Sequence, residues 1–95
     1  MSAYVLVDIC VNDAARYERY KELASPTIEA FDGRYLARGG ATKVLEGDLK
    51  PNRTVVLEFP SVARAIEWWN SELYRPIRQI RYETAESKML VVEGL

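Results

Sequence analysis

The residues from Ala3 to Val11, AYVLVDICV, alternate in side-chain character within a stretch rich in β-branched and aromatic types. This pattern predicts a strand, because successive side chains of a strand point to opposite faces of its sheet. TVVLEFP (54–60) and SKMLVVE (87–93) share that character. RYLARGG (34–40) is predicted as a further strand, with a bulge or bend at its glycine pair and strand character resuming at TKVLE (42–46).

Two helical segments separate these strands. The first contains AARYERYKELA (14–24), with Asn12 or Asp13 as its N-cap. Pro26 predicts a kink or a restart, because proline lacks an N–H group and clashes with the preceding turn. Gly33 is expected to end this helix in a left-handed conformation.

The second helical segment is VARAIEWWNSELY (62–74), which Ser61 caps and after which Pro76 opens a further helical turn. The resulting order is strand, helix, strand, strand, helix, strand. With right-handed crossovers, this order predicts an α+β, ferredoxin-like βαββαβ fold, with both helices on one face of a four-stranded antiparallel sheet. Residues 1–95 are expected to form this single domain.

Alternation also sorts the strand residues into two faces. One face is wholly apolar and is expected to pack on the helices. The other face is mixed but still largely apolar. Its members include Tyr4, Leu6, Asp8, Cys10, Arg34, Leu36, Arg38, Val56, Glu58, Leu90 and Val92. Since the helices already cover the first face, a monomer would expose a large apolar patch. We therefore expect a second copy of the chain to cover it, giving a homodimer with two sheets face to face.

Composition excludes several classes of protein. Thirteen basic and fourteen acidic residues give a net charge of −1, so neither nucleic acid nor an anionic membrane is an expected partner. The chain has no histidine and one cysteine, which removes the commonest metal ligand and general base and excludes an internal disulfide. We expect no metal site, no cofactor and a cytoplasmic location.

Several stretches together resemble one known family. They are RYLARGGATKVLEG (34–47), VVLEFPS (55–61), the aromatic pair before NSELY (70–74), the Arg78 and Arg81 segment, and LVVEG (90–94). In this order they are similar to the domain of unknown function 1330 family, in the dimeric α/β-barrel superfamily.

This resemblance covers nearly the whole chain and implies a ferredoxin-like fold and a dimer whose two sheets form a barrel. It implies no settled activity; the wider superfamily includes cofactor-independent monooxygenases, lactone isomerases and haem-handling proteins. Two positions depart from the family pattern. Asp32 stands where a second glycine is frequent, and Glu72-Leu73 replaces a common Pro-Glu pair, which puts any ligand contact from that loop in doubt.

Three charged residues lie within predicted strands and are candidate catalytic groups: Asp8, Glu58 and Arg38. The ferredoxin-like order places the third strand between the first and second, so Glu58 would neighbour Asp8 on one side and Arg38 on the other. Two close carboxylates opposed by an arginine would serve as an acid or a base, or would hold a polar ligand group. The alternative, which we favour, is that these residues form ion pairs in the dimer interface or face a wet mouth of the barrel.

Six residues are candidate ligand contacts. Glycines 39 and 40 would let the backbone approach a ligand that Arg38 clamps, although a strand bulge also explains them. Trp68 and Tyr74 would wall a cleft, whereas Trp69 is expected in the core with Ile66 and Leu73. Arg78 lies in a series with Arg75 and Arg81 that forms either an anion-binding stripe or, as we favour, a solvated helical face. The six are Arg38, Gly39, Gly40, Trp68, Tyr74 and Arg78.

The chain is thus expected to bind a small organic acid, in a pocket between sheet and helices or in the barrel. An enzyme of this composition would carry out proton transfer or cofactor-free oxidation, using a carboxylate base or a substrate acidic enough to ionise unaided. The alternative is a non-enzymatic dimeric binding or regulatory module. Cys10 is expected to be a small apolar residue of the sheet.

Overall fold

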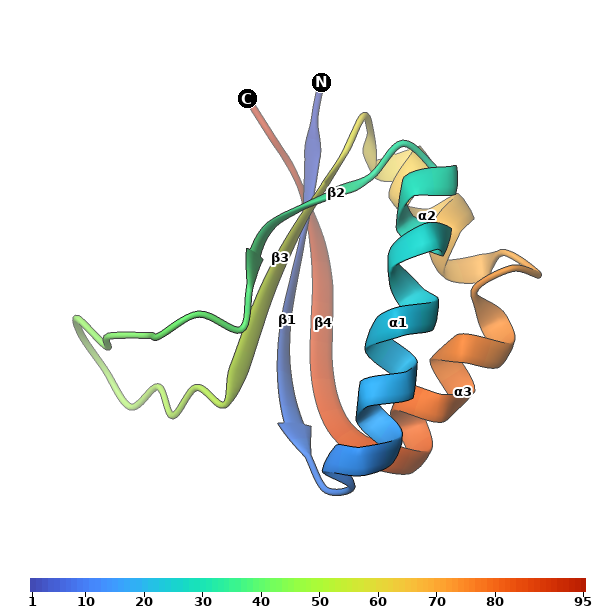
Figure 1. Ribbon diagram of the computed structural model, residues 1–95. Coiled ribbons are helices and arrows are strands. Elements are labelled where there is room, and N and C mark those ends of the chain that lie inside the picture. Colours follow the sequence, from blue (N-terminus) through green and yellow to red (C-terminus); the bar gives the residue numbers. More distant parts are fainter.

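Four antiparallel strands form one sheet, and three helices lie against one of its faces (Figure 1). The computed structural model describes residues 1–95, and its strands follow the spatial order β2-β3-β1-β4. This arrangement confirms the predicted ferredoxin-like α+β fold. None of the helices combines the length and apolar character needed to span a bilayer. The elements are β1 (Ala3–Val11), α1 (Ala14–Ala30), β2 (Arg34–Arg38), β3 (Arg53–Phe59), α2 (Val62–Asn70), α3 (Arg75–Thr84) and β4 (Ala85–Glu93).

The core lies between the helices and the face of the sheet predicted to be apolar. The period of two places alternate residues of β1 and β3 on this face, where they are almost fully buried. Each fully buried aliphatic side chain contributes about 1.5–3 kcal/mol, so this layer dominates the stability of the domain. Its main members are Val5, Val7, Ile9, Val55, Leu57 and Phe59 from the sheet and Tyr17, Tyr20, Ala24, Ile28, Ala65 and Trp68 from the helices.

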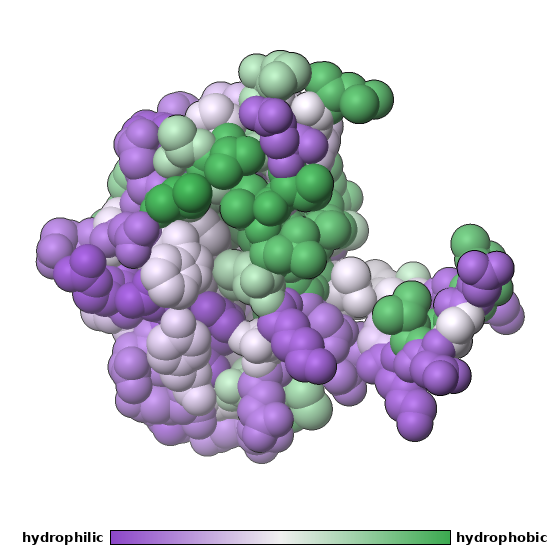
Figure 2. Space-filling view, turned by 180° about the vertical axis from the view of Figure 1, so that it is seen from behind, coloured by the Kyte–Doolittle hydropathy of each residue, from purple (hydrophilic) through white to green (hydrophobic).

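The opposite face of the sheet has no helix on it, as predicted. Leu6, Leu90 and Val92 are 39%, 56% and 45% exposed there. Cys10 is also exposed, so in the single chain it does not serve as the packed apolar residue that we expected. Figure 2, from the side opposite to Figure 1, views the sheet from its β4 edge and shows apolar side chains gathered beside that edge.

The helix starts follow the predicted capping chemistry. The Asp13 carboxylate accepts a hydrogen bond from the Arg16 backbone N–H at 3.2 Å, and the Ser61 hydroxyl accepts one from the Arg64 N–H at 3.0 Å. Pro26, in contrast, neither ends nor restarts the first helix, because α1 continues through it to Ala30.

The end of α1 corrects the prediction for Gly33. Asp32, not Gly33, has the left-handed conformation, with φ of 65°. Gly33 instead lies under the ring of Phe59, and an added Cβ there would stand 2.6 Å from that ring and 2.8 Å from Ile28. Close packing between α1 and β3, rather than backbone conformation, requires a glycine at this position.

The strand predicted to continue through TKVLE is absent. β2 ends at Arg38, and residues 41–52 form an exposed segment that projects from the body of the domain (Figure 1). The bulge also lies earlier than the glycine pair, between Tyr35 and Ala37. It turns Arg38 onto the helix side of the sheet, opposite Val55, whereas strict alternation had placed Arg38 on the open face.

Substitutions at the end of α1 test this correction. Gly33→Ala is expected to lower the free energy of unfolding by about 1–3 kcal/mol through overpacking against Phe59. Asp32→Gly is expected to leave stability unchanged or raise it slightly, because glycine adopts a positive φ without steric cost. Urea denaturation measures both. A Gly33→Ala protein as stable as the wild type would contradict the packing explanation.

Candidate functional site

A pocket of about 310 Å³ opens between α2, α3 and the β1–β4 side of the sheet. Its walls are mostly apolar, and its volume lies at the small end of the range for ligand sites. Two polar groups reach it from α3 and β4, Arg81 and Ser87. The lining is completed by Val5, Ala65, Ile66, Trp69, Tyr82, Met89 and Val91.

Arg81 is the unusual member of this lining, because its side chain carries a full charge and is only 3% exposed. Its Nε donates to the Tyr74 hydroxyl at 3.4 Å, and its Nη1 donates to the Ser87 hydroxyl. Both partners are neutral, and no carboxylate forms an ion pair with Arg81. A buried charge without a counter-ion costs several kcal/mol, so the pocket favours an anion.

Two buried tyrosines hold the guanidinium in place. The Tyr74 hydroxyl lies 2.8 Å from that of Tyr20, so a hydrogen-bonded chain runs from α1 to α3. Burial by itself lowers the pKa of Arg81, but the Tyr74 and Tyr20 oxygens outweigh it and raise that pKa above its usual value. Burial also raises the pKa of Tyr20 well above 10. Near neutral pH, Arg81 is therefore charged and Tyr20 is neutral.

One wall of the pocket is fixed by Arg78, one of the predicted ligand contacts. Its guanidinium lies 3.9 Å from the ring centre of Trp69 and donates to the Trp69 carbonyl oxygen at 2.9 Å. Cation–π contact of this kind orients an aromatic ring. Arg78 thus acts on the pocket through Trp69 and does not itself line it.

The two tryptophans exchange their expected roles. Trp68 is 1% exposed, stacks on Tyr74 with ring centres 4.2 Å apart, and donates Nε1 to the Thr27 hydroxyl at 3.1 Å. It belongs to the core, as does the fully buried Tyr74, so neither walls the open pocket. Trp69 lines the pocket instead. The prediction failed because Ile66 and Leu73, which defined the expected core stripe, are 48% and 50% exposed.

The structure does not bring Asp8, Glu58 and Arg38 together. Glu58 pairs across the sheet with Tyr4, whereas Asp8 pairs with Thr54, so roughly 13 Å of strand separates the two carboxylates. The Asp8 carboxylate accepts hydrogen bonds from the backbone and the side chain of Asn52, at 2.8 and 3.1 Å.

Glu58 has a different arginine partner from the one expected. The Arg34 Nε lies 2.7 Å from its carboxylate, and this hydrogen bond lowers the pKa of Glu58 below its usual value. Arg38 has left that face because of the bulge. Within the single chain, Glu58 therefore forms an ion pair with Arg34 and not with Arg38.

Arg38 and Gly39 lie at another place, beside α1. The Arg38 guanidinium lies 4.4 Å from the Tyr35 ring centre and donates to the Lys21 carbonyl oxygen at 3.2 Å. Gly39 has a φ of 70° and lies against Arg53, whereas Gly40 has open space around it. The predicted contacts thus divide between two regions of the domain.

Arg81, Ser87 and Tyr82 were not among the candidate site residues predicted from the sequence. The series of three arginines did contain Arg81, but a spacing of three along a helix carries successive side chains about 300° round the axis. Over two such steps the direction changes by about 120°, so Arg81 turns into the core while Arg75 stays exposed. The apolar neighbours Ile77 and Ile80 were the available signal.

The fold and the pocket define a small ferredoxin-like domain with a mostly apolar pocket that contains the buried Arg81. The family model described as "Domain of unknown function (DUF1330)" matches residues 2–95. The chain belongs to this family, as the sequence resemblance predicted. By sequence, no curated protein matches the chain.

Solved structures agree on the fold. A protein of unknown function from Rhodopseudomonas palustris, RPA0582, superposes with a TM-score of 0.78 at 21% identity, covering 99% of this chain and 82% of that one. SnoaB, a cofactor-independent oxygenase from Streptomyces nogalater, superposes with a TM-score of 0.68 at 10% identity, covering 99% of this chain and 93% of that one. A dimeric protein of unknown function with a ferredoxin-like fold from Bacteroides fragilis has a TM-score of 0.61 at 16% identity, covering 98% of this chain and 96% of that one.

Burial of the tyrosines predicts a loss of stability at alkaline pH. Burial raises the pKa of Tyr17 and of Tyr20 above the value of about 10 expected in the unfolded chain. Below pH 10 the folded and the unfolded chain both keep these protons, so the two tyrosines do not lower the free energy of unfolding there. Above it, the unfolded chain loses them first, so the free energy of unfolding falls as pH rises.

Urea denaturation between pH 8.5 and about 11 measures this slope. Tyr20→Phe removes one of the two groups and is expected to make the slope shallower, while Tyr82→Phe, at a 51% exposed position, should leave it unchanged. Equal slopes in the wild type and the Tyr20→Phe protein would contradict the assignment.

Proposed function

We propose that this protein binds a small organic acid in the pocket beside Arg81, with the acid group on the guanidinium and the apolar body between Trp69 and the sheet. The observation that carries the proposal is the charge of Arg81, buried among neutral partners in a mostly apolar pocket. An arginine presents paired N–H donors that match a carboxylate or an enolate. Met89 and Val91 supply the apolar surface beneath the ligand.

Cofactor-independent oxidation or proton transfer is a second candidate. The pocket lining includes no carboxylate, and the chain contains no histidine, so a substrate would have to ionise largely unaided. Arg81 favours that ionisation by stabilising the resulting anion. The similar fold of the cofactor-independent oxygenase SnoaB supports this candidate. A binding or regulatory module without turnover is the alternative, and it needs the same pocket.

We further propose that the protein is a homodimer, with the open faces of two sheets packed together. The exposed aliphatic side chains of β1 and β4 support this, because burying them removes apolar surface from water. The segment between β2 and β3 carries Leu45 and Leu49, 95% and 70% exposed, which a partner would also cover. A dimeric protein of similar fold supports the same arrangement.

Arg81→Met separates ligand binding from folding. Methionine keeps an apolar stem and removes the unpaired charge, which offsets the loss of the hydrogen bonds to Tyr74 and Ser87, so the free energy of unfolding is expected to change little. Binding of 2-naphthoate is expected to weaken roughly tenfold to a hundredfold, because charge-assisted hydrogen bonds contribute about 1.5–3 kcal/mol.

Calorimetric titration with 2-naphthoate measures this loss, and the neutral 2-naphthamide is the matched control ligand. Equal binding of the acid and the amide by the wild type would contradict the proposal, as would undiminished acid binding by Arg81→Met. Turnover of an acidic enol with uptake of oxygen would favour the enzymatic candidate over the binding module.

Leu90→Glu tests the dimer. Leu90 is 56% exposed on the open face, so a glutamate there should leave the single domain folded but place a charge within the proposed interface. Light scattering should give twice the chain mass of 10.9 kDa for the wild type and the single mass for the variant. Leu73→Glu is the control. Leu73 is 50% exposed in the turn between α2 and α3, so this variant should stay dimeric. A monomeric wild type would overturn the proposal.

A further inference from the structure

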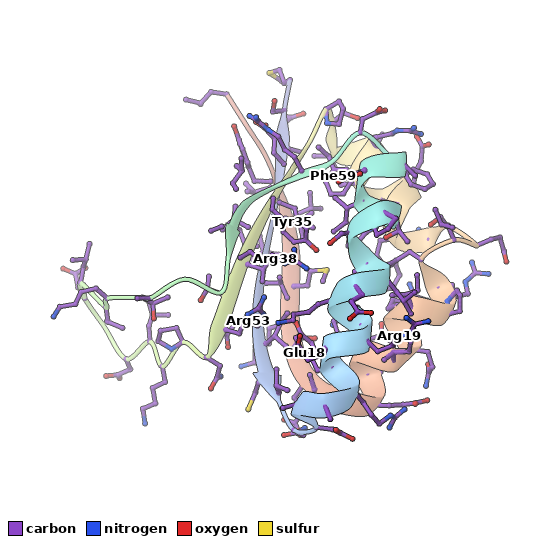
Figure 3. All side chains as sticks on the ribbon, in the orientation of Figure 1. Glu18, Arg19, Tyr35, Arg38, Arg53 and Phe59 are labelled. Carbon is purple, nitrogen blue, oxygen red and sulfur yellow. The ribbon has the colours of Figure 1, made fainter.

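A second group of basic side chains lies between α1 and the β2–β3 side of the sheet. Arg38 ends β2 and Arg53 begins β3, and both belong to the helix side, because Val55 pairs with Arg38 and follows Arg53 by two residues. Figure 3 shows both arginines beside Tyr35 and Glu18 in the space next to α1. The cleft is lined by Glu18, Lys21, Glu22, Ser25, Arg38 and Arg53.

The charges of the two arginines are not compensated within the chain. Of the acidic side chains in the cleft, Glu18 pairs with Lys21 at 2.9 Å and Glu22 pairs with Arg19 at 3.4 Å. Neither Arg38 nor Arg53 forms an ion pair with any carboxylate. Their two positive charges are therefore available to an incoming anion.

The surrounding residues hold these guanidinium groups in position. Arg38 stacks on the Tyr35 ring, and Arg53 lies 5.9 Å from the Tyr17 ring centre. The Nε of Arg53 is buried and has no hydrogen-bond partner. A buried donor of this kind costs about 1–3 kcal/mol when it stays unpaired, so the chain itself does not fully satisfy the Arg53 guanidinium.

Gly39 makes room for this arrangement. An added Cβ at this position would stand 2.2 Å from the Arg53 Nη1, and the φ of 70° independently favours glycine. The Gly39 backbone N–H donates to the Thr54 carbonyl oxygen at 2.8 Å, which ties the end of β2 to β3. The Arg-Gly pair noted in the sequence thus places both arginines on the same cleft.

We propose that the Arg38–Arg53 cleft is a second anion site, distinct from the Arg81 pocket, that binds a compact oxyanion such as a phosphate or carboxylate group. The cavity behind it holds only about 30 Å³, room for a single water molecule. An apolar body therefore does not fit there, and the ligand is held by its charged group at the mouth. This separates its chemistry from that of the Arg81 pocket.

Titration with inorganic phosphate, and separately with acetate, at constant ionic strength in sodium chloride tests the site. Heteronuclear NMR of the full chain locates the response, which is expected at residues 38, 39 and 53. Arg38→Gln should weaken binding about tenfold or more, since it removes a charge-assisted donor. Gly39→Ala should also weaken it by displacing the Arg53 guanidinium. The two anions separate phosphate from carboxylate preference.

Arg75→Gln is the matched control, because Arg75 is an exposed arginine that pairs with Glu72 and does not line the cleft. It should bind phosphate and acetate as the wild type does, and Arg38→Gln should keep the 2-naphthoate binding of the Arg81 pocket. Saturable phosphate or acetate binding that is equally strong in Arg38→Gln would overturn the proposal. So would a wild-type response to both anions no greater than that to added chloride.

Discussion

The hydrogen-bonded chain from Tyr20 through Tyr74 to Arg81 links the helices to one another and to the sheet. It joins α1 to the turn before α3, crosses to α3 itself, and reaches β4 through Ser87. Every member is at most 8% exposed except Ser87, so the chain works in a medium where hydrogen bonds are strong and unpaired groups are costly. The same contacts that fix the helices on the sheet therefore fix the direction of the Arg81 guanidinium. Folding therefore also positions the charged group of the proposed anion site.

The two basic sites differ in what surrounds the charge. Arg81 lies at the inner end of a pocket of about 310 Å³ with mostly apolar walls, which suits a molecule with an apolar body and one anionic group. Arg38 and Arg53 border an open cleft whose lining has no apolar residue, which suits a compact and well-hydrated anion. Met89 lines both the Arg81 pocket and the small cavity behind the cleft. A side chain as adaptable as methionine separates the two spaces without a rigid wall.

Periodicity predicted the parts of the fold that depend on local geometry. The alternation in Ala3–Val11 and in the third strand placed the buried and open faces correctly, because strand side chains must alternate. The same reasoning failed at β2, where the bulge between Tyr35 and Ala37 reverses the alternation and carries Arg38 to the other face. Nothing in the composition of RYLAR marks that bulge. Gly33 is a similar case, since its requirement comes from Phe59, 26 residues away in the chain.

The candidate site was predicted less well than the fold, for the same physical reason. Whether Trp68 or Trp69 enters the core depends on how α2 rotates against the sheet, and the exposed Ile66 made the wrong face look apolar. Arg81 was not distinguished in the sequence from Arg75 and Arg78, the other two arginines of its helix. A buried arginine is recognised only from the tertiary partners that desolvate it, here Tyr74, Ser87 and the apolar wall.

These partners also limit the chemistry of the pocket. A general base would need a carboxylate or an imidazole within hydrogen-bond reach of the ligand, and the pocket lining offers neither. A fixed positive charge within about 4–6 Å lowers the pKa of an acidic ligand by about one to three units. In the proposed site Arg81 would therefore stabilise the ionised form of an acidic ligand without taking the proton itself. Both proposed functions, binding and cofactor-independent turnover, depend on the charge of Arg81.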